Sequence, residues 1–186
     1  MFARDPKAKP GQPGHHTYLH HPQGKGRIDN PHMYDAWYFA EKPEAAVGEV
    51  RGDVSVWSDE MFETPFLPGG RYALGRFRLP DNVALLDLDH ASHLAERNLR
   101  PSEVVSRVRN TTQGWAASIF QEAQHDGSRK WAGVKWWSFQ RPQWVVFCLW
   151  VPRGAALVHE FVDCDPLYVT DAAVIDAAAA LTRPFR

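Results

Sequence analysis

Five of the eight tryptophans fall within one twenty-residue stretch of the chain. They are Trp131, Trp136, Trp137, Trp144 and Trp150. Tryptophan combines a large apolar area with one polar N–H. Such a cluster therefore forms either a core rich in large aromatic side chains or the wall of a site for a flat ligand. The stretch reads as two strands, 133–138 and 144–150, joined by a turn at 140–143. We interpret most of these rings as core.

The rest of the chain mixes strands and helices without a strict alternation, which favours an α+β fold. Further strands are expected at 34–39, 72–79, 83–88 and 155–161. Helices are expected at 43–50, 101–110, 112–125 and, capped by Asp171, at 171–181. Residues 1–26 hold four prolines and four glycines and should be irregular. We therefore predict an irregular arm over 1–17 and one compact domain over 18–186.

Length and charge exclude several classes of protein. The chain has 186 residues, which fits one domain better than two. Its net charge of −1 argues against a nucleic-acid or membrane-surface binder, because phosphate binding needs a surplus of positive charge. The longest apolar run, 144–151, is far shorter than the roughly 20 residues of a membrane helix. The chain starts without an apolar signal segment, so a cytoplasmic location is expected.

Several familiar motifs are missing from the sequence. It contains no P-loop, no dinucleotide-binding glycine fingerprint and no G-x-S-x-G elbow. The pairs His15-His16 and His20-His21 could ligate a metal, but no cysteine or H-E-x-x-H pattern supports them. We therefore expect no metal site.

Four residues are candidates for chemistry. Arg27, in a loop that follows Gly26, can offer a fork of donors to a phosphate or carboxylate; the alternative is a solvated loop arginine. Tyr38, in an aromatic strand, can stack on a planar group or simply pack against the strand. Glu49 can stabilise a developing cation or lie at the edge of its helix. Ser138, at a strand end, can position a ligand or cap a turn.

The order and context of these residues resemble the RES domain family, named for its arginine, glutamate and serine, over about residues 18–152. The pattern Y-x-A-x-x-P-x-x-A-x-x-E and the later pattern G-[IV]-x-[YW]-x-S are both matched. The matching residues are Tyr38, Ala40, Pro43, Ala46 and Glu49, then Gly133, Val134, Trp136 and Ser138. The family's arginine falls on Arg27. The proline- and histidine-rich opening differs from the short first strand that is usual in the family.

The resemblance implies a compact α+β domain similar to ADP-ribosyltransferases, with small split sheets around an NAD cleft. It implies a toxin that consumes NAD+ by hydrolysis or phosphorolysis, without a metal, and an Xre-type antitoxin as partner. Arg27, Tyr38, Glu49 and Ser138 would carry the reaction. His32, Tyr34 and Arg71 are further candidates for phosphate or ring contacts.

Three alternatives stay open. The same residues would serve an ADP-ribosyltransferase that modifies a protein. The tryptophan-rich region, with Trp136 and Trp137, could instead form a binding module without catalysis. A third possibility is a RES-like fold that has lost its activity.

Overall fold

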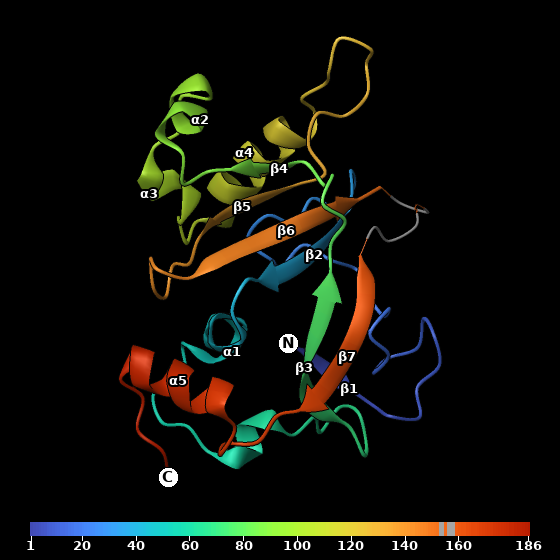
Figure 1. The fold of residues 1–186 in the computed structure, drawn as a ribbon, viewed down its shortest axis with the longest axis vertical. Coiled ribbons are helices and arrows are strands. Elements are labelled where there is room, and N and C mark those ends of the chain that lie inside the picture. The colour runs from blue at the N-terminus through green and yellow to red at the C-terminus, as the bar shows by residue number, and fades with distance from the viewer. Residues whose placement is uncertain (153–154, 156–158) are drawn as a thin grey trace. The chain divides into compact units, whose positions relative to one another are not determined.

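The computed structural model describes residues 1–152, 155 and 159–186, and has a mixed α+β fold with two β-sheets (Figure 1). The chain divides into two compact units. Unit 1 comprises 1–21, 40–78 and 159–186, and unit 2 comprises the described parts of 22–39 and 79–158. The chain therefore passes between the units more than once, and each unit is assembled from distant segments.

Unit 1 is built on an antiparallel sheet with the order β1-β3-β7 among the described strands. These strands are β1 (Phe2–Arg4), β3 (Arg71–Arg78) and β7 (Glu160–Pro166). The helices of this unit are α1 (Pro43–Arg51), η1 (Asp59–Phe62) and α5 (Ala172–Leu181), and α1 packs against α5. Pro43 starts α1, where its missing N–H costs no hydrogen bond. Trp57 and Phe62 are the largest side chains in the core of this unit.

Unit 2 is built on a sheet with the order β2-β6-β5-β4. These strands are β2 (Asp35–Ala40), β6 (Val145–Val151), β5 (Gly133–Trp137) and β4 (Leu85–Asp87). Strand β5 runs antiparallel to β6 and parallel to β4. The parallel pair needs a long connection, which contains α2 (Ala91–Glu96), α3 (Pro101–Val104) and α4 (Arg109–Phe120).

The burial of the tryptophans confirms the prediction that most of this cluster lies in the core. Trp136, Trp144 and Trp150 are buried, whereas Trp131 and Trp137 are partly exposed. Gly133 is needed where β5 meets β6. A Cβ atom at this position would lie 2.1 Å from the carbonyl oxygen of Cys148, well inside contact distance.

The structure differs from the sequence expectation at several ends of elements. The expected irregular opening contains β1, a short first strand that pairs with β3. The helix expected over 101–110 ends at Val104, and α4 begins at Arg109 and ends at Phe120. Asp171 does not cap α5 with its side chain, because its carboxylate accepts the N–H of Tyr168 instead. The start of the strand expected at 155–161 falls largely outside the described residues, and β7 begins at Glu160.

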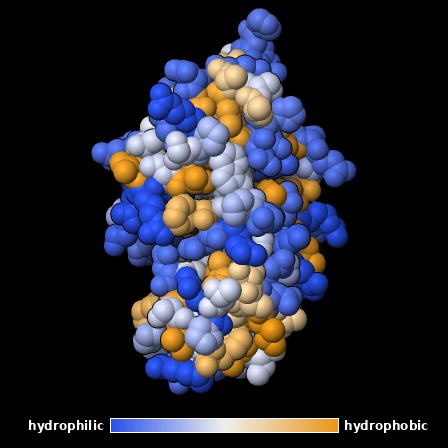
Figure 2. Space-filling model, turned by 90° about the vertical axis from the view of Figure 1, so that its left-hand side faces the viewer, coloured by the Kyte–Doolittle hydropathy of each residue, from blue (hydrophilic) through white to orange (hydrophobic). Residues whose placement is uncertain are grey.

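Part of unit 1 exposes apolar side chains. Figure 2 shows such side chains gathered in the lower part of the view. The exposed apolar residues around α1 and α5 are Val50, Val54, Val56, Ile175 and Phe185. No helix within the described ranges is long and apolar enough to cross a membrane.

Candidate active site

The loop that carries Arg27 is organised by the carboxylate of Asp29. This side chain is buried, and its Oδ2 accepts the N–H groups of Gly24 at 2.8 Å and Gly26 at 2.7 Å. Its Oδ1 accepts the hydroxyl of Tyr38 at 2.6 Å. A buried carboxylate with three donors is a rigid anchor, so Asp29 fixes the loop to strand β2.

Tyr38 uses its hydroxyl for structure and leaves its ring accessible. The hydroxyl donates to Asp29 and accepts the N–H of Ile28 at 3.0 Å. Burial of the hydroxyl, next to Cys148 and Asp29, raises the pKa of Tyr38 well above its usual range, so it stays protonated as a donor. The residue as a whole is nevertheless 42% exposed, although its hydroxyl is held by two hydrogen bonds. The ring can therefore contact a ligand.

Helix α4 holds the other side of the same loop. Gln113 donates its amide to the carbonyls of Gly24 at 3.2 Å and Gly26 at 3.1 Å. The hydroxyl of Thr112, which is fully buried, donates to the carbonyl of Arg27. Sequence reasoning missed Asp29, Thr112 and Gln113, because the last two lie more than 80 residues from the loop that they hold.

The guanidinium of Arg27 is held in place as well as its backbone. Its Nη1 donates to the carbonyl of Ser106 at 2.7 Å, and its Cζ lies 5.7 Å from the centre of the Phe139 ring. Arg107 contacts the same ring at 4.3 Å. Arg27 is thus a positioned cation rather than a solvated loop arginine.

Ser138 follows β5 directly and is 1% exposed. Its Oγ accepts the N–H groups of Gln140 at 2.9 Å and Arg141 at 3.2 Å, so it closes the turn that leads to β6. Through its neighbour Phe139, unit 2 brings Ser138 and Arg27 into one neighbourhood.

Glu49 belongs to unit 1 and lies in the last turns of α1. The helix buries Ala45, Val47 and Gly48, whereas Glu49 is exposed. Its carboxylate therefore lies at the accessible surface of the unit rather than in its core. The short helix begins three residues after β2, the strand that carries Tyr38.

The three further candidates lie in different environments. Tyr34 is fully buried; its hydroxyl donates to the Ile28 carbonyl at 2.6 Å, so it supports the loop from inside. His32 is exposed on the surface of unit 2. Arg71 lies in unit 1, where it forms an ion pair with Asp59 at 2.6 Å and stacks on Tyr168. The Val169 N–H, and with it Arg71, holds the pKa of the Asp59 carboxyl below its usual value, although burial acts in the opposite direction.

No group of three or more histidine, cysteine or acidic side chains that could hold a metal ion is found among the described residues, and the pair His15-His16 packs on other rings. His16 stacks flat on Phe161 of β7, with ring centres 3.7 Å apart, and His15 tilts against His16. Burial, and then His15, lowers the pKa of His16. This pair therefore helps to dock the N-terminal region on the sheet of unit 1.

Comparisons with known proteins identify the family. The family model of the RES domain matches residues 7–171. No curated protein sequence matches the chain. Among solved structures, a chain of the M. tuberculosis MbcT–MbcA toxin–antitoxin complex matches with a TM-score of 0.57 and 17% identity, over 83% of this chain and 76% of that one. The structural match shows a shared fold, and the family match covers most of the sequence. The chain belongs to the RES domain family.

Proposed function

We propose that this RES domain protein is a toxin that cleaves the nicotinamide–ribose bond of NAD+ by hydrolysis or phosphorolysis. The observation that supports this most is the loop 24–30, which Asp29, Thr112 and Gln113 lock so that Arg27 is presented beside Phe139. A side chain that is held rigidly in this way can bind a charged substrate in a single orientation.

Each of the four candidate residues has a role in this proposal. Cleavage of the bond builds positive charge on the ribose, as in other glycosyl transfers. The exposed carboxylate of Glu49 stabilises this charge, and the guanidinium of Arg27 binds the diphosphate. The exposed ring of Tyr38 stacks on the nicotinamide, and the hydroxyl of Ser138 positions the nicotinamide ribose or the carboxamide.

A protein that depletes NAD+ needs a neutralising partner, and we propose an antitoxin of the Xre type. The similar structure comes from a toxin–antitoxin complex. The exposed apolar region of Val50, Val54, Val56, Ile175 and Phe185 is a surface that a partner protein would cover. Expression of the chain alone should arrest growth, and co-expression of its antitoxin should restore it. Normal growth with the chain alone would contradict this part of the proposal.

The reaction is tested by incubating the protein with NAD+ labelled in the ADP-ribose part, with and without inorganic phosphate. Free ADP-ribose indicates hydrolysis, and ADP-ribose 1-phosphate indicates phosphorolysis. Label that stays on protein would instead indicate an ADP-ribosyltransferase, which would use the same residues. Absence of nicotinamide release under every condition would refute the proposal.

The rival proposal of a tryptophan-rich binding module has less support. Trp136 is buried among the strands of unit 2 and offers little surface to a ligand. A binding module would show ligand binding without nicotinamide release, and that binding would depend on Trp137, the more exposed of the two neighbouring rings.

A further inference from the structure

Unit 1 contains an open cavity of about 570 Å³ at the N-terminal end of β3. Its polar lining includes Arg4, Arg71 and Glu63, and Tyr168 forms part of its wall. The apolar walls of the cavity are formed by four prolines from separate segments, namely Pro6, Pro65, Pro68 and Pro166. A volume of this size is typical of a site for a small organic molecule.

The two arginines meet because of the strand register. In the antiparallel pair β1–β3, Arg4 lies directly opposite Arg71, so both side chains project from the same face of the sheet. Both line the cavity. Two like charges directly opposite each other destabilise a strand pair unless an anion compensates them.

The guanidinium groups of Arg4 and Arg71 differ in how many hydrogen-bond and ion-pair partners they have. Arg71 is fixed, because its Nε donates to the Leu167 carbonyl at 2.6 Å, its Nη2 pairs with Asp59 and its guanidinium stacks on Tyr168 at 4.2 Å. Within residues 1–152, 155 and 159–186, the structure gives the side chain of Arg4 no hydrogen bond or ion pair. Arg4 is only half-buried and can turn toward a ligand. The cavity thus combines one rigid and one adjustable cation.

We propose that this cavity binds a small organic phosphate. The phosphate group would lie against Arg4, whose planar fork of donors matches its oxygens, and beside Nη1 of Arg71, which neither the Leu167 carbonyl nor Asp59 engages. The organic part would lie along the proline walls beside Tyr168, which is 46% exposed. Glu63, exposed at the cavity, opposes the anion and weakens its binding. This binding site does not depend on the proposed cleavage of NAD+.

The test follows the amide signals of Gly69 and Gly70 by NMR, because both glycines line the cavity. The full chain is titrated with AMP, with inorganic phosphate and with acetate at constant ionic strength. AMP should shift both signals at the lowest concentration, phosphate at a higher one, and acetate least. Unchanged signals at tens of millimolar AMP would overturn the proposal. Binding of phosphate without AMP would overturn the assignment to an organic phosphate.

Three variants make the test specific. Arg4→Gln should weaken AMP binding by about tenfold or more, since a charge-assisted contact is lost. Glu63→Gln should strengthen binding, because it removes the opposing charge. Arg78→Gln is the matched control: this arginine lies at the other end of β3, pairs with Glu160 and should leave binding unchanged. Equal AMP affinity in Arg4→Gln and wild type would refute the site, provided that the β1 amide signals show intact pairing.

Phosphate binding at the cavity and cleavage of NAD+ can fail separately. Loss of the Gly69 and Gly70 shifts would leave nicotinamide release untouched. Conversely, a chain that releases no nicotinamide could still bind AMP at this cavity. NAD+ that shifted Gly69 and Gly70 with the same Arg4 dependence as AMP would identify the dinucleotide as another source of the phosphate and would support the site.

Discussion

At the scale of single residues, the candidate site of unit 2 rests on side chains that serve both structure and chemistry. Tyr38 anchors a loop with its hydroxyl and exposes its ring, and Ser138 closes a turn with its oxygen. Arg27 is held through both its carbonyl and its guanidinium. Substitutions at these positions therefore need a stability measurement beside every activity measurement.

Tyr38→Phe removes the hydroxyl and keeps the ring. Asp29 then loses a donor and the Ile28 N–H loses its acceptor, so unfolding free energy should fall by about 1–3 kcal/mol. Denaturant unfolding measures this loss. Tyr168→Phe is the control, because Tyr168 is exposed, and its stability should change by less than about 0.5 kcal/mol. Equal stabilities of the two variants would show that the Tyr38 hydroxyl does not stabilise the fold.

Ser138→Ala separates the two roles of the hydroxyl. Loss of the turn acceptor should lower stability by about 1 kcal/mol, because the N–H groups of Gln140 and Arg141 lose their partner. If Ser138 also positions the substrate, nicotinamide release should fall at least about tenfold in the folded variant. Ser118→Ala, on an exposed face of α4, should change neither quantity. Wild-type turnover in folded Ser138→Ala would leave Ser138 only its turn role.

The sequence predicted these residues unevenly. Arg27, Tyr38 and Ser138 stand in recognisable patterns, and the structure brings them into one unit. Asp29, Thr112 and Gln113 carry no local signal, because what defines them is contact between segments far apart in the chain. Asp171 was predicted correctly as the residue before α5, but its side chain bonds the preceding turn and not the helix.

At the scale of elements, strands and helices were predicted well where an apolar pattern determines the element. They were predicted poorly where a partner far away in the sequence determines it. The strand pair β5–β6 follows from its apolar pattern. Strand β1 exists only because β3 pairs with it, which a proline-rich sequence does not reveal. The helix that begins at Pro101 is shorter than predicted. In the segment that follows it, the Ser106 carbonyl accepts a hydrogen bond from Arg27.

Gly133→Ala tests the close approach of β5 and β6. The added methyl group would overlap the Cys148 carbonyl, so the backbone must shift and stability should fall by about 1–3 kcal/mol or more. Gly114→Ala, in open space within α4, should instead raise stability by about 0.5–1 kcal/mol, because alanine favours a helix. Thermal unfolding of both variants checks the opposite signs. A neutral Gly133→Ala would contradict the strand packing described above.

The docking of the N-terminal region should depend on pH. Burial, and then His15, lowers the pKa of His16, and burial and then His16 lowers that of His159. Folding thus favours the neutral form of both, so their stabilising effect is present above the usual histidine pKa of about 6.5 and is lost as pH falls below it. The melting temperature should therefore drop between pH 7.5 and 5.5. The drop should be smaller in His16→Phe, which keeps the stacked ring; an equal drop would exclude His16 as the cause.

At the scale of the whole molecule, the chain is a RES domain protein whose two units are each assembled from distant segments. The class of fold and the family followed from the sequence, because alternating strands, a helix after Pro43 and the two residue patterns are local features. The division into two units did not, because it depends on which distant segments pack together. The central functional claim is that Glu49, on α1 of unit 1, stabilises the cation formed from NAD+.

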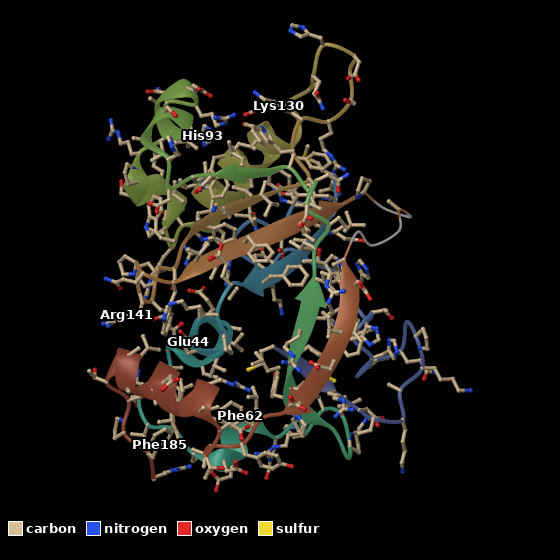
Figure 3. All side chains as sticks on the ribbon, in the orientation of Figure 1. Glu44, Phe62, His93, Lys130, Arg141 and Phe185 are labelled. Carbon is tan, nitrogen blue, oxygen red and sulfur yellow. The ribbon has the colours of Figure 1, made fainter. Side chains whose placement is uncertain are left out.

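The most direct measurement of this claim compares nicotinamide release by wild type, Glu49→Gln and Glu44→Gln. Both glutamates lie on α1, and Glu44 is labelled in Figure 3. Loss of one electrostatic group should cost about 3–4 kcal/mol, so Glu49→Gln should release nicotinamide roughly 10²–10³-fold more slowly while keeping its melting temperature. Glu44→Gln should match wild type. Wild-type turnover in Glu49→Gln, or an equal loss in both variants, would contradict the mechanism.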